Sequence, residues 1–198
     1  GTLATFAAKA VGQSNVYVNE IGTRRLAILR ALGFEHVGTE DAMYLHSIRT
    51  KQRQPVPTVV VMNPPFSSAV QQGRHNPHVG ARHVEEALKL LAPGGRLVAI
   101  VGKGMAMDAP TFRQWWTRIL GQYTVRANIL VDGNIYRKQG TTFDTRILVI
   151  DKGAATAPRS SLTGQVTTLD QLLNMIEEVR YVRTTSEQYP SSEPDRQA

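Results

Sequence analysis

The apolar run from Thr58 to Met62, followed at once by Asn63-Pro64-Pro65-Phe66, limits most strongly what this chain can fold into. An uninterrupted apolar run of this length is typical of a strand buried in a parallel sheet. Two consecutive prolines cannot continue a hydrogen-bonded ladder, so the strand must end there. Proline also favours extended backbone at the residue before it. Asn63 is therefore predicted at the carboxyl end of the strand, where open α/β sheets bind ligands.

The tetrapeptide suits one kind of chemical group. The Asn63 side-chain oxygen and the Pro64 carbonyl can both accept hydrogen bonds from one planar amino group. Phe66 can stack on the ring that carries this amino group. We therefore expect a catalytic grip on an exocyclic amino group, made by Asn63, Pro64, Pro65 and Phe66. The alternative is an Asn-Pro turn at a strand end with Phe66 in the core.

Strand and helix patterns alternate along most of the chain. Strands are predicted over residues 15–20, 34–37, 58–62, 96–101, 123–131 and 145–150, and helices over 23–32, 83–91 and 110–120. Such alternation predicts an α/β fold with a doubly wound, mostly parallel sheet. The last two strands are joined by about 13 residues without a helical pattern, which favours an antiparallel hairpin at the edge of the sheet.

Composition divides the chain into two parts, a domain over residues 1–152 and a tail over 153–198. Residues 153–168 are rich in Ala, Ser, Thr and Gly and are predicted to be a linker. Residues 169–182 are predicted to form one helix, and 184–198 to be disordered. Within the domain, residues 49–57 are predicted to be a polar loop. Trp115 and Trp116 are expected to be half in the core and half at the surface.

Charge is distributed unevenly. The net charge is +7, but residues 151–198 hold five basic and seven acidic side chains, so the rest of the chain carries +9. A basic body suits a polyanionic partner such as DNA, or is simply a basic surface. No apolar run approaches membrane-spanning length, no signal-peptide pattern opens the chain, and cysteine is absent. These features lead us to expect a cytoplasmic protein with no membrane partner.

The tetrapeptide matches the signature (Asn/Asp/Ser)-Pro-Pro-(Tyr/Phe/Trp), and the chain resembles the class I S-adenosylmethionine-dependent amino-methyltransferases, in particular the N6-adenine DNA methylases. Residues 140–152 resemble the terminal hairpin strand of the group found beside strawberry-notch-like helicase domains. The resemblance implies the class I methyltransferase fold, S-adenosylmethionine as cofactor, and methyl transfer to N6 of a flipped adenine in DNA. It also implies a helicase-like domain as a partner within a larger polypeptide.

The resemblance also implies a set of cofactor residues. Glu20 would hold both ribose hydroxyls, and Ile21 would pack on the cofactor adenine. Asp41 would accept a hydrogen bond from the adenine amino group, with Glu40 as its competitor. The full set implied is Gly1, Thr2, Glu20, Ile21, Asp41, Ala42 and Asn63. Without a cofactor role, Glu20 would be an acidic cap for the helix that begins near Thr23.

One part of the family pattern is missing. The family's strand and glycine-rich cofactor loop should precede the first helix, yet here Gly1 matches the final glycine of that loop. Either an upstream segment or another chain supplies these elements, or cofactor binding has been lost. The competing functions are thus an amino-methyltransferase, acting on DNA, RNA or a protein glutamine, and a non-catalytic binding or scaffold domain of a larger nucleic-acid-processing protein.

Two loops offer candidate contacts to nucleic acid. Arg74 lies in the segment from Ser67 to Gly80, which is predicted to close over substrate. Tyr136 can stack on a flipped base, and Arg137 and Lys138 can contact phosphate, unless they are solvated hairpin residues. Nearby histidines His75, His78 and His83 match no metal-ligand spacing, so no metal site is expected.

Overall fold

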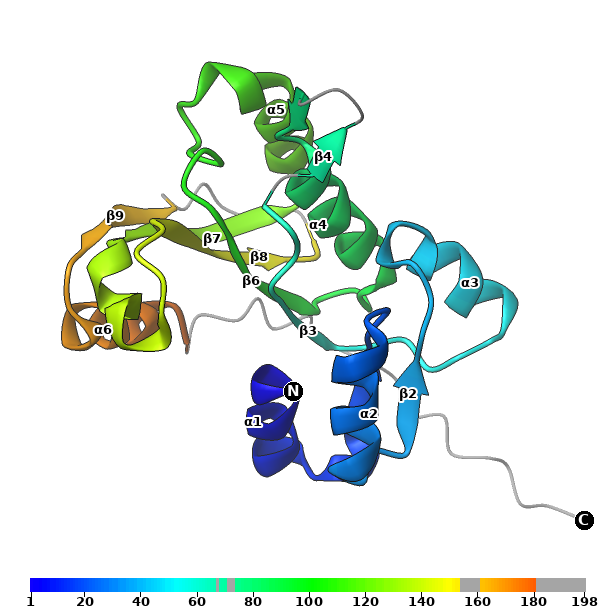
Figure 1. Cartoon of the computed structure of the whole chain (residues 1–198). Coiled ribbons are helices and arrows are strands. Elements are labelled where there is room, and N and C mark those ends of the chain that lie inside the picture. The colour runs from blue at the N-terminus through cyan, green and yellow to red at the C-terminus, as the bar shows by residue number, and fades with distance from the viewer. Residues whose placement is uncertain (67, 71–73, 154–160, 181–198) are drawn as a thin grey trace, which may run out of the picture.

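The computed structural model describes residues 1–66, 68–70, 74–153 and 161–180 (Figure 1). The α-helices are α1 Thr2–Val11, α2 Thr23–Ala31, α3 Leu45–Lys51, α4 Val79–Leu90, α5 Arg113–Gln122 and α6 Leu169–Arg180. The strands are β1 Tyr17–Asn19, β2 His36–Gly38, β3 Val59–Met62, β4 Ser68–Val70, β5 Arg74–Asn76, β6 Arg96–Gly102, β7 Thr124–Val131, β8 Thr145–Asp151 and β9 Leu162–Val166. The short 3-10 helices are η1 Gln13–Asn15, η2 Ala42–Tyr44, η3 Pro110–Phe112 and η4 Gly133–Gln139.

The main sheet has five strands in the order β3-β6-β8-β7-β9. β3 runs parallel to β6, and β9 runs parallel to β7. β8 is antiparallel to both of its neighbours, so the predicted antiparallel hairpin of the last two domain strands is confirmed. The hairpin does not lie at the sheet edge as predicted, because β8 is inserted beside β6 and β9 covers β7.

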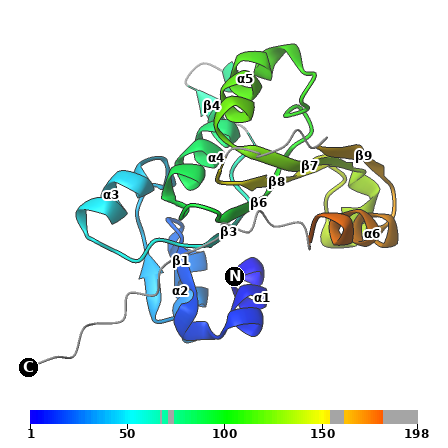
Figure 2. The same ribbon diagram turned by 180° about the vertical axis from the view of Figure 1, so that it is seen from behind.

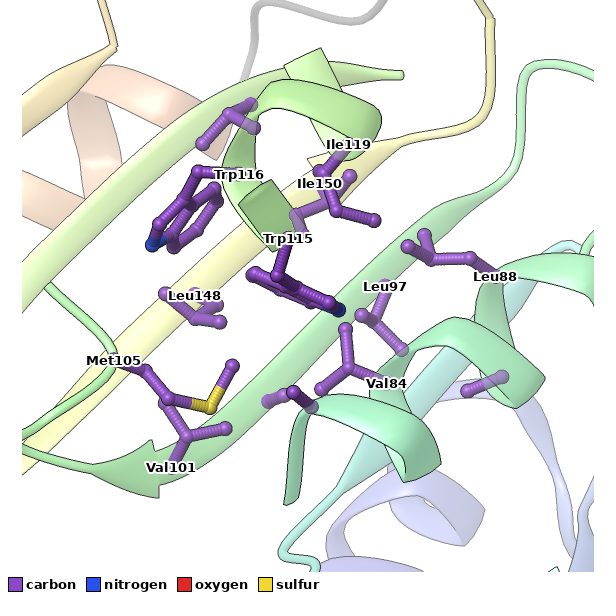
Figure 3. Close-up of a cluster of buried hydrophobic side chains, with 14 of the residues drawn as sticks. Val84, Leu88, Leu97, Val101, Met105, Trp115, Trp116, Ile119, Leu148 and Ile150 are labelled. Atoms are coloured by element: carbon purple, nitrogen blue, oxygen red, sulfur yellow. The ribbon is translucent and has the colours of Figure 1, made fainter. Parts of the chain in front are cut away.

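One face of the main sheet is covered by α4 and α5 (Figures 1 and 2). Alternate residues of β6 and β8, such as Leu97, Val101 and Leu148, meet Val84 and Trp116 from these helices in the first core cluster (Figure 3). Strand alternation places these side chains together, because every second residue of a strand points to the same face. Burial at this interface anchors the carboxyl ends of β3 and β6.

The opposite face is covered by α6 and η4 in a second core cluster. A β-bulge in β7 lets this strand serve both clusters. Val125 packs in the first cluster, whereas Ala127 and Ile129 pack in the second. The extra residue between them is Arg126, whose guanidinium donates to Asp151 in a buried ion pair (Nε–Oδ2 2.8 Å).

The two remaining parallel strands, β1 and β2, form a separate sheet. We call α1, β1, α2 and β2 together the β1–β2 unit. Figures 1 and 2 show its two helices side by side. Among the described residues, its core has three buried apolar side chains, Val16, Leu29 and Phe34, which are 8%, 4% and 7% exposed. The neighbouring strand β3 leaves Val59 and Val61 44% and 45% exposed.

Several sequence predictions need correction. Residues 153–168 were predicted to be a linker, but residues 162–166 form β9. The prediction missed this strand because Gly164 and its polar neighbours show no alternation of apolar and polar side chains. Residues 49–51 belong to α3 and not to a loop. Trp115 and Trp116 are both buried, at 5% and 2% exposure, because α5 lies directly over the sheet. The predicted disorder of 184–198 lies outside the described residues.

Candidate active site

Asn63 follows the last residue of β3 directly, at the carboxyl end of the strand. Its side chain is exposed, and among the described residues it takes part in no hydrogen bond. Pro64 is buried, while Pro65 and Phe66 are exposed. The amide is thus held on an anchored strand with its polar atoms available to a ligand. This placement is the one predicted from the sequence.

Phe66 lies against the end of the neighbouring strand. A Cβ atom at Gly102, the last residue of β6, would lie 3.3 Å from the Phe66 Cβ. Only a glycine leaves this approach without strain, since real Cβ contacts are rarely so short. The carboxyl ends of β3 and β6 are therefore brought together at Phe66.

A cavity of about 570 Å³ opens at this point. It is bounded by the loop after β6 and the loop before β8. Its lining residues are Phe66, Pro77, Gly102, Lys103, Gly104, Met105, Phe112, Thr142, Phe143 and Asp144. Three of these are phenylalanines, so the cavity suits a flat apolar surface with a polar edge.

An ion pair joins the two loops at the cavity. Lys103 Nζ lies 3.2 Å from Asp144 Oδ2, and the Gly133 N–H donates to Asp144 Oδ1 at 2.9 Å. The Gly133 hydrogen bond, and then the Lys103 ammonium, hold the pKa of Asp144 below its ordinary value. A Cβ atom at Gly133 would lie 1.9 Å from the Thr142 carbonyl oxygen, so only glycine fits there. These contacts fix the segment that carries Phe143.

Phe143 is a residue that the sequence analysis missed. Its side chain is 75% exposed and lines the same cavity as Phe66. The signal for it was an aromatic residue between the last two domain strands, the same signal that led to Tyr136. The structure packs Tyr136 against the second core cluster, with its hydroxyl 3.1 Å from Thr145 Oγ1.

Arg137 and Lys138, two of the other predicted nucleic-acid contacts, lie apart from the cavity lining. The Arg137 guanidinium donates to Asn134 Oδ1 at 2.6 Å, and Lys138 is exposed in the same 3-10 helix η4. Arg74 begins β5, which pairs antiparallel with β4. Its side chain lies outside the described part of the structure.

Glu20 comes directly after β1, where its carboxylate is already engaged. Arg25 donates to both carboxylate oxygens, at 2.7 and 3.0 Å, and the Gly22 N–H donates at 2.7 Å. These contacts, the Arg25 hydrogen bond first, lower the pKa of Glu20 from its ordinary value. The carboxylate is therefore charged at neutral pH, and a hydroxyl ligand would have to share it with Arg25.

Asp41 follows β2 and caps η2, where its Oδ1 accepts a hydrogen bond from the Met43 N–H at 2.9 Å. Asn19 fixes the preceding residue. Its amide donates to the Glu40 carbonyl at 2.8 Å and accepts from the Glu40 N–H at 3.2 Å. Since Asn19 precedes Glu20 in the chain, this pair of bonds ties the Asp41 loop to the end of β1.

The remaining predicted cofactor residues before Asn63 lie on or next to the β1–β2 unit. Ile21, two residues after the end of β1, is 65% exposed. Gly1 caps α1 and Thr2 begins it, and Ala42 begins η2. A second cavity, of about 490 Å³, lies between the β1–β2 strands and α3, and it is lined by Asn19 and Glu40 among others. Glu20, Asp41 and Ile21 are not part of that lining.

Residues 1–127 match the model of the methyltransferase small domain. The chain belongs to this family. Its cofactor is S-adenosylmethionine, as the sequence analysis predicted. The match contains every predicted cofactor residue and the whole of Asn63-Pro64-Pro65-Phe66. No curated protein matches the sequence.

Solved structures agree on the fold. A Listeria monocytogenes protein assigned to the class I S-adenosylmethionine-dependent methyltransferases matches 91% of this chain and 70% of its own, with 15% identity and a TM-score of 0.52. The DrdV–DNA complex matches 98% of the chain with 11% identity and a TM-score of 0.59, but only 26% of its own length. The Type ISP enzyme LlaGI with a DNA substrate mimic matches 89%, with 13% identity, a TM-score of 0.56 and 23% of its length. The class I methyltransferase fold is thereby confirmed.

The residues present fit the nucleoside part of this cofactor. Glu20 offers a charged carboxylate for the ribose hydroxyls. Ile21 offers an exposed apolar side chain for the face of the adenine. Asp41 offers a carboxylate for the adenine amino group. Within the described ranges, no cluster of three His, Asp or Glu side chains is arranged to hold a metal ion. No helix in the same ranges is long and apolar enough to cross a membrane.

Proposed function

We propose that this methyltransferase domain acts on an exocyclic amino group of a nucleic-acid base, N6 of adenine in DNA. The observation that carries this proposal is Asn63. Its amide is exposed at the carboxyl end of β3, makes no hydrogen bond to the described residues, and stands three residues before the aromatic ring of Phe66 at the cavity. Two phenylalanines at the cavity, Phe66 and Phe143, favour a planar ring over the flexible side chain of a glutamine.

The chemistry follows from what Asn63 and Pro64 can accept. An aromatic amino group is a weak nucleophile, because its lone pair is delocalised into the ring. Hydrogen bonds from its two N–H groups to the Asn63 side-chain oxygen and the Pro64 carbonyl draw the nitrogen toward tetrahedral geometry. The same two fixed dipoles stabilise the positive charge that develops on the nitrogen. S-adenosylmethionine, when bound, supplies the methyl group on a sulfonium centre.

The remaining residues have supporting roles in this proposal. Phe66 and Phe143 hold the ring of an extruded base, which costs a few kcal/mol to remove from a duplex. Glu20 and Asp41 orient the cofactor nucleoside from the β1–β2 unit. Positioning of the two reactants in line then lowers the barrier further. DrdV and LlaGI, both of similar fold, have been solved with DNA or a DNA mimic, which supports DNA as the substrate.

Arg74, Arg137 and Lys138 are proposed to contact the phosphate backbone. They belong to the part of the chain that carries the basic surplus. A helicase-like domain in the same polypeptide, as in the group beside strawberry-notch-like helicases, is a further part of this proposal.

A non-catalytic role has one observation in its favour. Arg25 donates hydrogen bonds to both carboxylate oxygens of Glu20. The residue that would hold the ribose hydroxyls therefore already has hydrogen-bond partners within the protein. Calorimetry with S-adenosylmethionine distinguishes the two functions. Measurable binding that weakens by about 2–4 kcal/mol in Glu20→Ala supports the enzyme, because two charge-assisted hydrogen bonds are lost.

The test of the enzyme is Asn63→Ala. Transfer of a labelled methyl group to adenine-containing DNA should fall by about 100-fold or more, as expected when a preorganised acceptor is lost from the transition state. Thermal unfolding should be unchanged, because the side chain is exposed. Asn15→Ala is the matched control, since Asn15 is also exposed and its side chain bonds, within the described residues, only to the Val11 carbonyl. An Asn63→Ala variant that keeps most of its rate would refute the proposed grip.

A further inference from the structure

The loop from Gly102 to Ala106, which leaves β6, forms one wall of the cavity next to Phe66. Four of its residues, Gly102 to Met105, line that cavity. Gly102 also lies in close approach to Phe66, so a shift of this loop changes the space beside the ring. The position of the loop therefore sets the shape of the proposed base site.

Side chains from three different elements hold this loop by its carbonyl oxygens. Arg146 Nε, from β8, donates to the Lys103 carbonyl at 2.8 Å. Asn128 Nδ2, from β7, donates to the Met105 carbonyl at 3.1 Å. Trp116 Nε1, from α5, donates to the Ala106 carbonyl at 2.9 Å. Three carbonyls within four residues are thus fixed by groups that are distant in the sequence.

Two of these side chains also hold each other. Arg146 Nη1 donates to Asn128 Oδ1 at 2.9 Å, so both ends of the Asn128 amide are used. Asn128 is only 1% exposed. A buried amide is tolerated in a core only when it is hydrogen-bonded. If one member of a buried hydrogen bond is removed, the polar group that stays behind is unpaired and destabilises the fold by its cost of desolvation. Asn128 faces the loop because the β7 bulge has shifted the alternation of the strand.

None of these three side chains lines the cavity. We propose that Arg146, Asn128 and Trp116 are positioning residues, which hold the loop from Gly102 to Ala106 as a preformed wall of the base site. This inference rests on the proposed function of that site. Its physical basis is that a binding site must be held close to its productive geometry before the ligand arrives, by groups whose own orientation is locked.

The test compares two substitutions that keep the charge. Arg146→Lys retains the cation but loses the planar fork that reaches Lys103 and Asn128 together. Arg118→Lys is the matched control, because Arg118 pairs with Glu85 on the outer surface and contacts no residue of the loop. Asn128→Asp is a second variant, which retains an acceptor for Arg146 and loses the donor to Met105.

Two measurements are made on each variant. Amide hydrogen exchange over residues 103–106 and the indole N–H resonance of Trp116 report the loop without any ligand. Fluorescence anisotropy of an end-labelled single-stranded oligonucleotide with one adenine, compared with the same oligonucleotide with thymine in its place, reports the base site. In Arg146→Lys and Asn128→Asp we expect exchange over the loop to be about tenfold faster or more, and the adenine-dependent part of the binding to weaken about tenfold. Arg118→Lys should match the wild type in both measurements.

The outcomes separate this inference from the proposed function. Unchanged exchange over residues 103–106 in both variants would overturn the positioning role. Faster exchange with unchanged adenine-dependent binding would overturn the link between the loop and the base site. Absence of adenine-dependent binding in the wild type, with slow exchange over the loop, would refute the proposed base site while the positioning of the loop stands.

Discussion

The two halves of the candidate site rest on very different foundations. Asn63, Phe66 and Phe143 extend from the main sheet, whose first core cluster joins β3, β6, β7 and β8 to α4 and α5. The predicted cofactor residues before Asn63 lie on or next to the β1–β2 unit, whose core has only three buried apolar side chains within the described residues. Since buried apolar area is the main source of stability, the substrate half should be rigid and the cofactor half much weaker.

A pair of leucine truncations tests this difference most directly. Leu88 is fully buried in the first core cluster, and Leu29 is 4% exposed in the β1–β2 unit. We expect Leu88→Ala to lower the free energy of unfolding by about 3–5 kcal/mol, and Leu29→Ala by less than half of that, because fewer surrounding atoms lose contacts. Urea denaturation followed by circular dichroism measures both.

Tryptophan fluorescence adds a second probe to the same experiment. Trp115 and Trp116 both lie in the first core cluster, so their emission reports that region alone (Figure 3). If the β1–β2 unit is the weaker region, the circular dichroism transition of Leu29→Ala should begin at lower urea than the fluorescence transition. Coincident transitions with equal losses in the two variants would show that the molecule is a single cooperative unit.

Cofactor binding should protect the β1–β2 unit against local opening. The amide of Val18 in β1 should exchange at least about 100-fold faster than that of Leu148 in β8. S-adenosylmethionine at 100 times its dissociation constant adds about 2.7 kcal/mol to any opening that destroys its site. Protection at Val18 should then rise about 100-fold, and protection at Leu148 should rise as much, because global unfolding also destroys the site. Unchanged protection at Val18 with a gain at Leu148 would contradict the assignment of the cofactor to the β1–β2 unit.

Within the main sheet, the two tryptophans should respond differently to replacement by phenylalanine. Trp116 donates to the Ala106 carbonyl, whereas Trp115 Nε1 is buried without a partner among the described residues. Trp116→Phe leaves a carbonyl unpaired and should cost about 1–3 kcal/mol, while Trp115→Phe removes an unsatisfied donor and should change stability by about 1 kcal/mol or less. Thermal denaturation of both variants checks this order, which equal losses would contradict.

The smallest effect is expected at the Glu20–Arg25 pair. Arg25 is 65% exposed, so Arg25→Ala should change stability less than any of the substitutions above. The lowered pKa of Glu20 means that the pair stabilises the fold above the ordinary carboxyl pKa, and that this contribution is lost as pH falls through the folded-state pKa. An NMR titration of Glu20 should show its pKa rising toward the ordinary value in Arg25→Ala. An unchanged pKa would show that Gly22 alone holds it down.

Sequence patterns predicted the main sheet better than the site. Alternating or continuous apolar runs mark β3, β6, β7 and β8, and the two prolines after Met62 fix where Asn63 stands. By contrast, α3 carries only Leu45 and Ile48 as large apolar residues, so its helix has no readable periodicity. β9 is short and largely polar, and it forms because β7 offers an open edge. Long-range pairing of this kind has no local signal.

The candidate site was predictable only where a local sequence pattern determines it. The end of a strand is enough to place Asn63. Which of the two aromatic residues Tyr136 and Phe143 lines the cavity depends on how the loop before β8 folds back. That fold is determined by the Asp144 carboxylate on the Gly133 N–H and by the absence of a side chain at Gly133. Neither contact could be read from spacing. The side chains that hold the loop from Gly102 to Ala106 come from three separate elements and were equally invisible.

The bulge in β7 has a consequence for changes in chain length. Val125, Ala127, Ile129 and Val131 alternate without interruption in the sequence, yet Val125 lies on the opposite face from the other three. Deletion of the single residue Arg126 would keep every apolar side chain of the strand on its present face, because consecutive residues of a regular strand point to opposite faces, as Val125 and Ala127 already do. Its cost would be the loss of the buried ion pair with Asp151. Deletion of any one residue between Ala127 and Val131 would instead turn one segment of the strand over, since a one-residue slip moves every side chain to the other face.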